Sequence, residues 1–444
     1  MNSNLFFEYE NISVLGASGK MGRGIVLLLS KTMLRYNFQL DIKQKIIAFD
    51  LSSDSLLEMM VYIEFQSTRY AEKNIQLIRD FYKDNTDLSR DSDLIHFYTK
   101  EIKGLIHTTE KVEDTYDSEL IFEAVSEKIE IKTNIFEKIN LNSNVRPYFF
   151  TNTSSIPISI IETKSQLTGR VIGLHFYNPP PVQKLLEIIR SENTEEKLFE
   201  LAVDIGQLLN KRIVYAPDFA GFIGNGQFLR EVSYAAYLVE NISENHGFSE
   251  AIFLVNELTR DVLLRPMGIF EVVDYVGLDV CNAILSVMQK AFPDETFNDS
   301  FLKCWIKSGQ IGGQDTNGQS KNGVFKYEQG DITDVFNGFE YQSIKPINLS
   351  ELTSCTWKDL RSKDSITKIL EVHFKNLQKS KNIFSVIAVE YGKECQKIAE
   401  NLVAKKIAFS SNDVNQIMTL GFHHLYGPIN SYFDTPLPVR SLNK

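Results

Sequence analysis

The sequence predicts an α/β N-terminal domain built on a doubly wound parallel sheet, followed by all-α C-terminal domains in tandem repeat. Three observations support this fold class. Strand-like and helix-like segments alternate in the first half of the chain, which is typical of parallel α/β sheets. Apolar residues at helical spacing dominate the second half. A segment that begins near residue 247 recurs in similar form near residue 408.

The composition favours a globular protein that works on small molecules. A chain of 444 residues, 43% of them apolar, is long enough for two or three domains with full cores. A net charge of −10 without blocks of like charge argues against nucleic acid or an anionic membrane as partner. The four cysteines have neither disulfide nor metal spacing. Because we find no signal peptide and no membrane-spanning run, we expect a cytoplasmic protein.

The first element is a strand, a glycine-rich turn and a helix. "NISVLG" is typical of a short core strand, "GASGKMG" of the turn, and "RGIVLLLSKTMLR" of the helix. Glycines let a pyrophosphate approach the helix N-terminus, so the turn predicts a Rossmann-type cofactor site, with an ordinary βα turn as the alternative. The spacing is one residue longer than the usual fingerprint. The residues assigned to cofactor binding in this turn are Gly16, Ala17, Gly19, Lys20, Met21 and Gly22.

The next strand, "KIIAFD", ends at Asp50. A carboxylate there would accept hydrogen bonds from a ribose diol and repel a 2′-phosphate, which favours NAD over NADP. The alternative for Asp50 is a helix N-cap or a turn residue, a role that Ser52 or Ser53 could also take. A long, charged helical segment is expected from about 52 to 103. Two further core strands, "SELIFEAV" and "RPYFFTNTSS", carry polar residues at the sheet edge where ligands bind.

A predicted hairpin brings a histidine and a glutamate together. "RVIGLHF" and "KLLEIIR" are typical of β-strands, and the intervening "YNPPPVQ" suits a connection because proline needs no ladder donor. In an antiparallel pair, His175 and Glu187 would face each other. A neutral imidazole is a well-matched base near pH 7, and a carboxylate stabilises its charged form. The alternatives are a structural histidine and a solvated glutamate. The remaining histidines show no metal spacing, so no metal site is predicted.

The second half predicts a duplicated helical domain. "GFSEAIFLVNELTRDVLLRPMGIFEVVD" and "AFSSNDVNQIMTLGFHHLYGPINSYFD" share a start signal, an amphipathic helix and a glycine-containing break. We expect the two copies to pack on each other within one chain, so that a monomer is feasible. The expected divisions are 1–216 for the NAD-binding domain, 217–330 for the first helical domain, 331–366 for a linker, and 367–444 for the second, degenerate copy.

Five motifs together resemble the 3-hydroxyacyl-CoA dehydrogenase family. They are "FEAVSEKIEIK", "TNTSSIPIS", "HFYNPPPVQKLLEII", "DFAGFIGNG" and "RPMGIFEVVDYVGLD", in the family's order and approximate spacing. The tail resembles the second C-terminal domain of the long family members. The resemblance implies NAD as cofactor and reversible oxidation of (S)-3-hydroxyacyl-CoA to 3-ketoacyl-CoA. The setting would be fatty-acid β-oxidation or short-chain 3-hydroxybutyryl-CoA metabolism, with an acyl-CoA partner and a monomer or homodimer.

The resemblance also implies roles for individual residues. His175 matches the catalytic base and Glu187 its paired carboxylate. The other matching residues are Ser154 and Asn225 around the reacting oxygen, Glu127, Lys132, Asn178 and again Ser154 near the nicotinamide half of the cofactor, and Lys73 as a CoA contact. From the residues alone, Ser154 and Asn225 have helix capping as their alternative. One departure is Gly226, which stands where an arginine is common.

Two other functions stay open. A related NAD-dependent dehydrogenase could act on a hydroxy acid without CoA. A non-catalytic binding protein on the same fold would keep the glycine turn and lose the His/Glu pair, but both members of that pair are present.

Overall fold

The computed structural model describes residues 5–40, 44–85, 87–314, 319–345, 347–353, 355–363 and 365–434. Backbone contacts divide the chain into two compact units, Met1–Asp218 and Phe219–Lys444. The finer division of the second unit stays a prediction. Among the helices that lie within the described residues, none has both the length and the apolar character needed to cross a bilayer.

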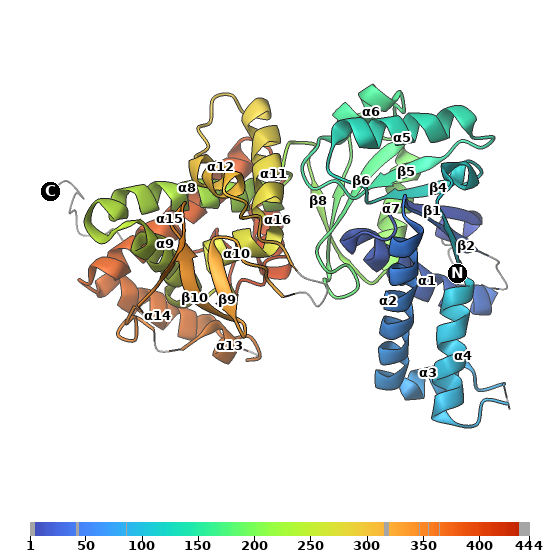
Figure 1. The fold of residues 1–444 in the computed structure, drawn as a ribbon, viewed down its shortest axis with the longest axis horizontal. Helices are drawn as coiled ribbons and strands as arrows, with labels where there is room; N and C mark the ends of the chain where they lie inside the picture. Colours follow the sequence, from blue (N-terminus) through green and yellow to red (C-terminus); the bar gives the residue numbers. More distant parts are fainter. Residues whose placement is uncertain are drawn as a thin grey trace. The chain divides into compact units, whose positions relative to one another are not determined.

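The first unit alternates strands and helices along the chain (Figure 1). Its strands are β1 (Asn11–Leu15), β2 (Lys45–Phe49), β3 (Ile106–Thr109), β4 (Leu120–Glu123), β5 (Tyr148–Thr151), β6 (Val171–Phe176), β7 (Leu185–Ile189) and β8 (Arg212–Ala216). Its helices are η1 (Leu5–Glu8), α1 (Lys20–Leu40), α2 (Ser53–Lys73), α3 (Ile75–Phe81), α4 (Asp91–Gly104), η2 (Val112–Thr115), α5 (Ile129–Asn142), α6 (Ile158–Ser165) and α7 (Glu196–Leu208).

These strands form one sheet in the order β3-β2-β1-β4-β5-β6-β7-β8. The first six are parallel, and their order is that of a Rossmann dinucleotide-binding fold, which confirms the predicted sheet. β7 runs antiparallel to β6, and β8 runs parallel to β7. The order reverses between β1 and β4, so the carboxyl ends of these strands border the crevice where such sheets bind ligands.

Burial explains why the central strands are almost continuously apolar. Every residue of β4, β5, β6 and β7 is buried, as expected for strands covered by helices on both faces. The predicted helical segment forms α2, α3 and α4, with α2 and α4 side by side (Figure 1). Ser52 caps α2, because its hydroxyl accepts a hydrogen bond from Ser55 N–H at 3.2 Å. Asp50 is therefore not the cap of this helix.

The second unit is mainly helical. Its helices are α8 (Gly224–His246), α9 (Phe248–Glu257), the π-helix η3 (Leu258–Val262), α10 (Ile269–Val276), α11 (Leu278–Ala291), α12 (Ser300–Lys307), α13 (Trp357–Leu360), α14 (Thr367–Lys379), α15 (Ile383–Ala404) and α16 (Ser411–Leu420). It also holds an antiparallel sheet of β9 (Phe325–Glu328), β10 (Asp331–Phe336) and β11 (Tyr341–Ser343).

The small sheet differs from the all-α expectation, and it occupies part of the segment 331–366 that was expected to be a linker. β9 and β10 are joined by Gln329 and Gly330, with φ of 54° and 94°. Two consecutive positive φ values are what a tight two-residue hairpin requires. Val335 and Phe336 of β10 are buried in the core of the unit. The strands form because this hairpin brings their apolar side chains onto the helices.

The repeat has a counterpart in the backbone packing. A Cβ on Gly268 would lie 2.2 Å from Oδ1 of Asn256, and a Cβ on Gly427 would lie 2.2 Å from Oδ1 of Asn415. In both copies the asparagine precedes the glycine by the same interval, and its Oδ1 accepts a backbone N–H just beyond the glycine. Only glycine fits so close an approach.

The two copies share one core, as the sequence predicted. Leu370, Phe374 and Tyr391 belong to the same buried cluster as residues of α8 to α11. A buried ion pair lies within this core, with Arg265 Nη1 2.7 Å from Glu231 Oε2. Bonds that join the two copies run from Arg265 to Cys395 Sγ, from Gln227 to Cys395 O, from Tyr426 to Leu263 O, and between His373 and Val262 O.

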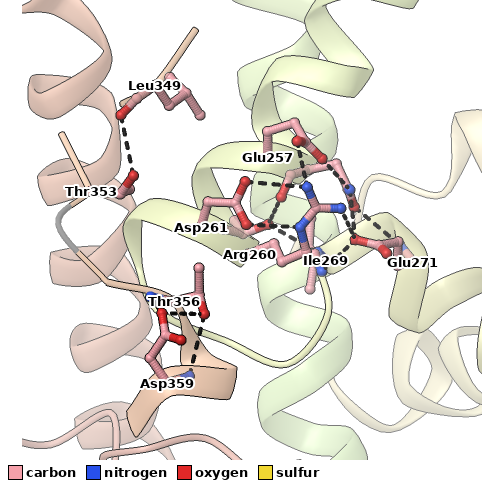
Figure 2. A network of polar contacts seen from close by, with 12 residues as sticks. Glu257, Arg260, Asp261, Ile269, Glu271, Leu349, Thr353, Thr356 and Asp359 are labelled. Carbon is pink, nitrogen blue, oxygen red and sulfur yellow. Dashed lines mark hydrogen bonds and ion pairs between the residues drawn. The ribbon is translucent and has the colours of Figure 1, made fainter. Parts of the chain in front are cut away.

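A second polar cluster surrounds the π-helix (Figure 2). The guanidinium of Arg260 contacts three carboxylates, at 2.5 Å to Glu257, 2.9 Å to Asp261 and 3.4 Å to Glu271. Burial raises the pKa of Glu257 to about 7, against the opposing effect of Arg260 and with the help of the other two carboxylates. Ionising Glu257 therefore costs free energy in the folded state.

Glu257→Gln is expected to raise the melting temperature more at pH 8 than at pH 5. Because the folded-state pKa of Glu257 lies above the ordinary value of 4.5, its contribution to stability is fully present below that value and is lost as pH rises through about 7. Glutamine removes this loss while Arg260 keeps two carboxylates. Thermal melts at both pH values check it, with the exposed Glu244→Gln as control. Equal changes at the two pH values would contradict it.

Candidate active site

The glycine turn packs so closely against its own backbone and against Ala124 that a side chain would collide there. Gly16 has φ of +70°, and a Cβ there would lie 2.7 Å from the carbonyl oxygen of Ala124. A Cβ on Gly22 would lie 2.0 Å from the carbonyl oxygen of Gly16. α1 begins at Lys20, so the amides of its first turn lie beside β1 and β4 at the switch point of the sheet. This arrangement fits the pyrophosphate of a dinucleotide.

Asp50 follows β2 at the same edge and is held against the turn. Its Oδ2 accepts a hydrogen bond from Ser18 N–H at 2.9 Å and another from the Ser18 hydroxyl, and its Oδ1 accepts one from Leu51 N–H at 2.8 Å. The carboxylate thus lies next to the glycine turn, at the end of β2.

A buried lysine links two glutamates beyond β4. Lys132 Nζ lies 2.7 Å from Glu123 Oε1 and 3.1 Å from Glu127 Oε2. Burial alone would lower the pKa of Lys132, but the two carboxylates raise it above its usual value. Burial likewise opposes the charge on Glu127, but Lys132 and the donors around it lower the pKa of Glu127. Lys132 and Glu127 are therefore charged at neutral pH.

Ser154 is bound to this network. Its N–H and its hydroxyl lie 2.8 and 3.3 Å from Oε1 of Glu127. α6 begins at Ile158, and Pro157 is its N-cap residue, so Ser154 does not cap that helix. The capping alternative is thereby removed, and the serine lies at the ligand-binding edge beyond β5.

The predicted hairpin is confirmed. β6 and β7 are antiparallel with His175 paired to Glu187, and Nδ1 of the histidine lies 2.6 Å from Oε2 of the glutamate. The glutamate side chain is fully buried and the histidine side chain is 10% exposed. In the tautomer with its proton on Nδ1, the histidine donates to Glu187 and Nε2 carries no proton.

The connection between the two strands packs against the glycine-turn helix. A Cβ on Gly24 of α1 would lie 2.9 Å from Cδ of Pro180. Lys211, just before β8, donates hydrogen bonds to the carbonyl oxygens of Pro180 and Gln183, each at 2.6 Å. Burial lowers the pKa of Lys211 to about 8. These contacts hold the hairpin beside the cofactor turn. The Asn178–Pro179 peptide bond in this connection is cis.

Three residues of the site were not found from the sequence. Tyr177 donates a hydrogen bond to Glu187 Oε2 at 2.9 Å, Lys211 binds the connection, and Glu123 holds Lys132. The sequence could have indicated Tyr177, because residues two apart on a strand point to the same face and Tyr177 lies two residues after His175. Lys211 is distant in sequence, and no local pattern indicates its contacts.

The structure does not bring Lys73 to these residues. Lys73 is exposed and ends the 21-residue helix α2, about 30 Å along its axis from the edge of the sheet. Asn225 lies in the first turn of α8, in the second unit. The guanidinium of Arg230, one turn later in α8, packs against the neighbouring Gly226. Its Nη1 lies 3.5 Å from where a Cβ on Gly226 would be. Arg230 also donates to the Gly226 carbonyl oxygen at 2.8 Å.

The fold and the site together define a dinucleotide-binding oxidoreductase. The family model of the 3-hydroxyacyl-CoA dehydrogenase NAD binding domain matches residues 11–219, and that of the 3-hydroxyacyl-CoA dehydrogenase C-terminal domain matches residues 221–322. The chain belongs to the 3-hydroxyacyl-CoA dehydrogenase family. Within the described residues there is no cluster of three or more His, Cys, Asp or Glu side chains suited to a metal ion.

Several relatives share this assignment. The chain is 30% identical over 227 residues to a probable 3-hydroxybutyryl-CoA dehydrogenase of Deinococcus radiodurans, covering 51% of this chain and 78% of that protein. It is 29% identical over 323 residues to a probable 3-hydroxyacyl-CoA dehydrogenase of Caenorhabditis elegans, covering 72% and 94%. The crystal structure of 3-hydroxybutyryl-CoA dehydrogenase from Escherichia coli has the same fold, with a TM-score of 0.63, 19% identity, and coverage of 95% of this chain and 90% of that one.

Proposed function

We propose that the chain oxidises (S)-3-hydroxyacyl-CoA to 3-ketoacyl-CoA with NAD, reversibly, in fatty-acid β-oxidation or 3-hydroxybutyryl-CoA metabolism. The chief support is the His175–Glu187 pair, held at 2.6 Å beside a glycine turn shaped for a dinucleotide. Relatives named for 3-hydroxyacyl-CoA and 3-hydroxybutyryl-CoA substrates support the thioester class.

The histidine acts as the general base. Nε2 of His175 accepts the proton of the substrate hydroxyl as the carbinol carbon is oxidised. Glu187 is fully buried, so its negative charge stabilises the imidazolium strongly and fixes the tautomer that keeps Nε2 available. NAD, when bound at the glycine turn, supplies the hydride acceptor. In the reverse direction the imidazolium returns the proton to the ketone oxygen.

The remaining roles are part of the same proposal. Ser154 and Asn225 bind the reacting oxygen, and Glu127, Lys132 and Asn178 support the nicotinamide half of the cofactor. The charged Glu127–Lys132 contact at 3.1 Å and the two bonds from Ser154 to Glu127 support this grouping. Lys73 is proposed as a CoA contact on the family resemblance, and its exposed position at the end of α2 leaves its side chain accessible to a ligand.

A thioester chain-length series with NADH, followed at 340 nm, tests the substrate class. Acetoacetyl-CoA and longer 3-ketoacyl-CoA thioesters are expected to be reduced, and free acetoacetate to be reduced far more slowly. The alternative function, a dehydrogenase of a hydroxy acid without CoA, predicts equal or better rates with the free acid. A non-catalytic protein predicts no NADH consumption with either.

NAD is expected to be preferred over NADP by at least about tenfold in kcat/KM, because Asp50 would meet a 2′-phosphate with like charge. Asp50→Ser should reduce this preference. The matched control is Ser18→Ala, which removes a hydrogen bond to Asp50 and leaves its charge in place. Equal efficiencies of the two cofactors with the wild-type chain would remove Asp50 from this role.

We also propose a monomer or homodimer in the cytoplasm that binds neither nucleic acid nor membrane. The shared core of the two helical copies supports the monomer, because it covers apolar surface that would otherwise be exposed. The net charge of −10 supports the absence of a nucleic-acid partner.

A further inference from the structure

The carboxylate of Glu187 has a second donor. The Tyr177 hydroxyl lies 2.9 Å from Oε2, the same oxygen that His175 Nδ1 contacts at 2.6 Å. The rings of Tyr177 and His175 are 4.8 Å apart between centroids. One oxygen of Glu187 therefore receives hydrogen bonds from two side chains that share one face of the hairpin.

Tyr177 remains a donor at every pH at which an enzyme of this class works. Burial, together with the neighbouring Glu187 carboxylate, raises the pKa of Tyr177 well above its usual value. A neutral O–H dipole aimed at the carboxylate takes up part of its negative charge. That leaves less charge to stabilise an imidazolium, so the hydroxyl opposes protonation of the histidine while it fixes the position of the carboxylate.

Other charged and titratable groups on the elements packed around this pair are Tyr148 on β5, Glu162 and Lys164 on α6, Glu196, Lys197, Glu200 and Asp204 on α7, and Lys211, Arg212 and Tyr215 at β8. Glu162 accepts a hydrogen bond from Ser191, and Asp204 accepts one from the backbone of Phe6. Lys211 donates to backbone carbonyls of the connection. Tyr177, by contrast, acts directly on the carboxylate of Glu187 through its hydroxyl, which donates to Oε2 at 2.9 Å.

We propose that Tyr177 is a positioning residue that sets the proton balance between His175 and Glu187. Its hydroxyl fixes the position of Oε2 beside Nδ1. By sharing the charge of the carboxylate, the hydroxyl also reduces how strongly Glu187 stabilises the protonated imidazole. This inference rests on the proposed function, because it concerns the base of that reaction. It goes beyond that function by predicting the pH at which the rate of oxidation rises and the pH at which the rate of reduction falls.

Tyr177→Phe tests it in the full-length chain. Without the hydroxyl, the carboxylate has one hydrogen-bond donor fewer to share its charge, so it stabilises the imidazolium more strongly. The pH of half-maximal kcat/KM for 3-hydroxyacyl-CoA oxidation should therefore rise by roughly 0.5 to 1 unit. At pH 7, oxidation should fall severalfold, whereas reduction of acetoacetyl-CoA, which needs the imidazolium, should hold or increase. A variant that is damaged in folding would instead show lower rates of both oxidation and reduction.

Two comparisons sharpen the result. Glu187→Gln should move the half-maximal pH the opposite way, and adding Tyr177→Phe to it should change nothing further, because the tyrosine acts through that carboxylate. The matched control is Tyr148→Phe. Tyr148 lies on β5 of the same sheet, and its hydroxyl donates a hydrogen bond to Glu195 at 2.9 Å. That control should leave both pH profiles unchanged.

The outcomes separate this inference from the function it rests on. A Tyr177→Phe profile that superimposes on wild type, in a chain where His175→Gln is inactive, overturns the role of Tyr177 alone. A wild-type chain that reduces no 3-ketoacyl-CoA overturns the proposed function. If Tyr177→Phe does not fold, the same two profiles are measured with Tyr177→Met, for which an unshifted half-maximal pH equally overturns the role.

Discussion

His175→Gln is expected to lower kcat for 3-hydroxyacyl-CoA oxidation by about 10²–10⁴-fold, the usual contribution of one general base. Glutamine keeps a polar side chain of similar reach but cannot take a proton near pH 7. NAD affinity should change little, because the glycine turn and Asp50, which we propose as the cofactor contacts, follow other strands of the sheet. Steady-state rates and NAD titration by fluorescence check the two parts separately.

Two further variants interpret that result. Glu187→Gln keeps the hydrogen bond to Nδ1 and removes the charge, so it should also reduce kcat substantially and shift the acidic side of the rate profile to lower pH. The control is His96→Gln, an exposed histidine on α4, which should leave the rate unchanged. A folded His175→Gln chain with a rate within threefold of wild type would reduce the hairpin to a structural role.

A chain that ends at residue 365 is expected to aggregate or to dimerise. The truncation removes Leu370, Phe374 and Tyr391 from the core that they share with α8 to α11. A buried apolar side chain of this size contributes about 1.5–3 kcal/mol, so losing several approaches the roughly 5–15 kcal/mol that stabilises a typical domain. The buried Arg265–Glu231 pair would also become accessible to water, since Cys395 and Tyr391 no longer cover it.

Size-exclusion chromatography with light scattering checks the truncation. A chain that ends at residue 434 keeps every described residue of the shared core and serves as the control, and it should behave as the full-length chain does. A chain that ends at 365 and stays soluble and monomeric, with a cooperative melt, would show that the first helical copy is stable without the second.

The sequence predicted those parts of the fold that depend on local pattern. The apolar runs of β4 to β7 indicated central strands, and the three glycines indicated the turn, because each constraint lies within a few residues. The His175–Glu187 contact followed from the same logic, since two strands joined by a short connection fix their own register.

Other features required tertiary structure. Lys211 binds carbonyl groups about 30 residues earlier in the chain, and nothing in its neighbourhood indicates those contacts. β9 and β10 are short and only partly alternating, so the sequence placed β9 and the Gln329–Gly330 turn in the helical domain 217–330 and β10 in the linker 331–366. The roles of Lys73 and Asn225 came from the family resemblance. Neither residue takes part in the contacts described above for the glycine turn, the Glu127–Lys132 network or the His175–Glu187 pair.

The purified full-length chain, incubated with NAD and (S)-3-hydroxybutyryl-CoA, should form NADH and acetoacetyl-CoA in a one-to-one ratio. Absorbance at 340 nm measures the first product and mass spectrometry the second. The (R)-thioester and free 3-hydroxybutyrate should give little or no NADH, and the His175→Gln chain should give neither product at a comparable rate. NADH formation from free 3-hydroxybutyrate with none from the (S)-thioester would contradict the assignment.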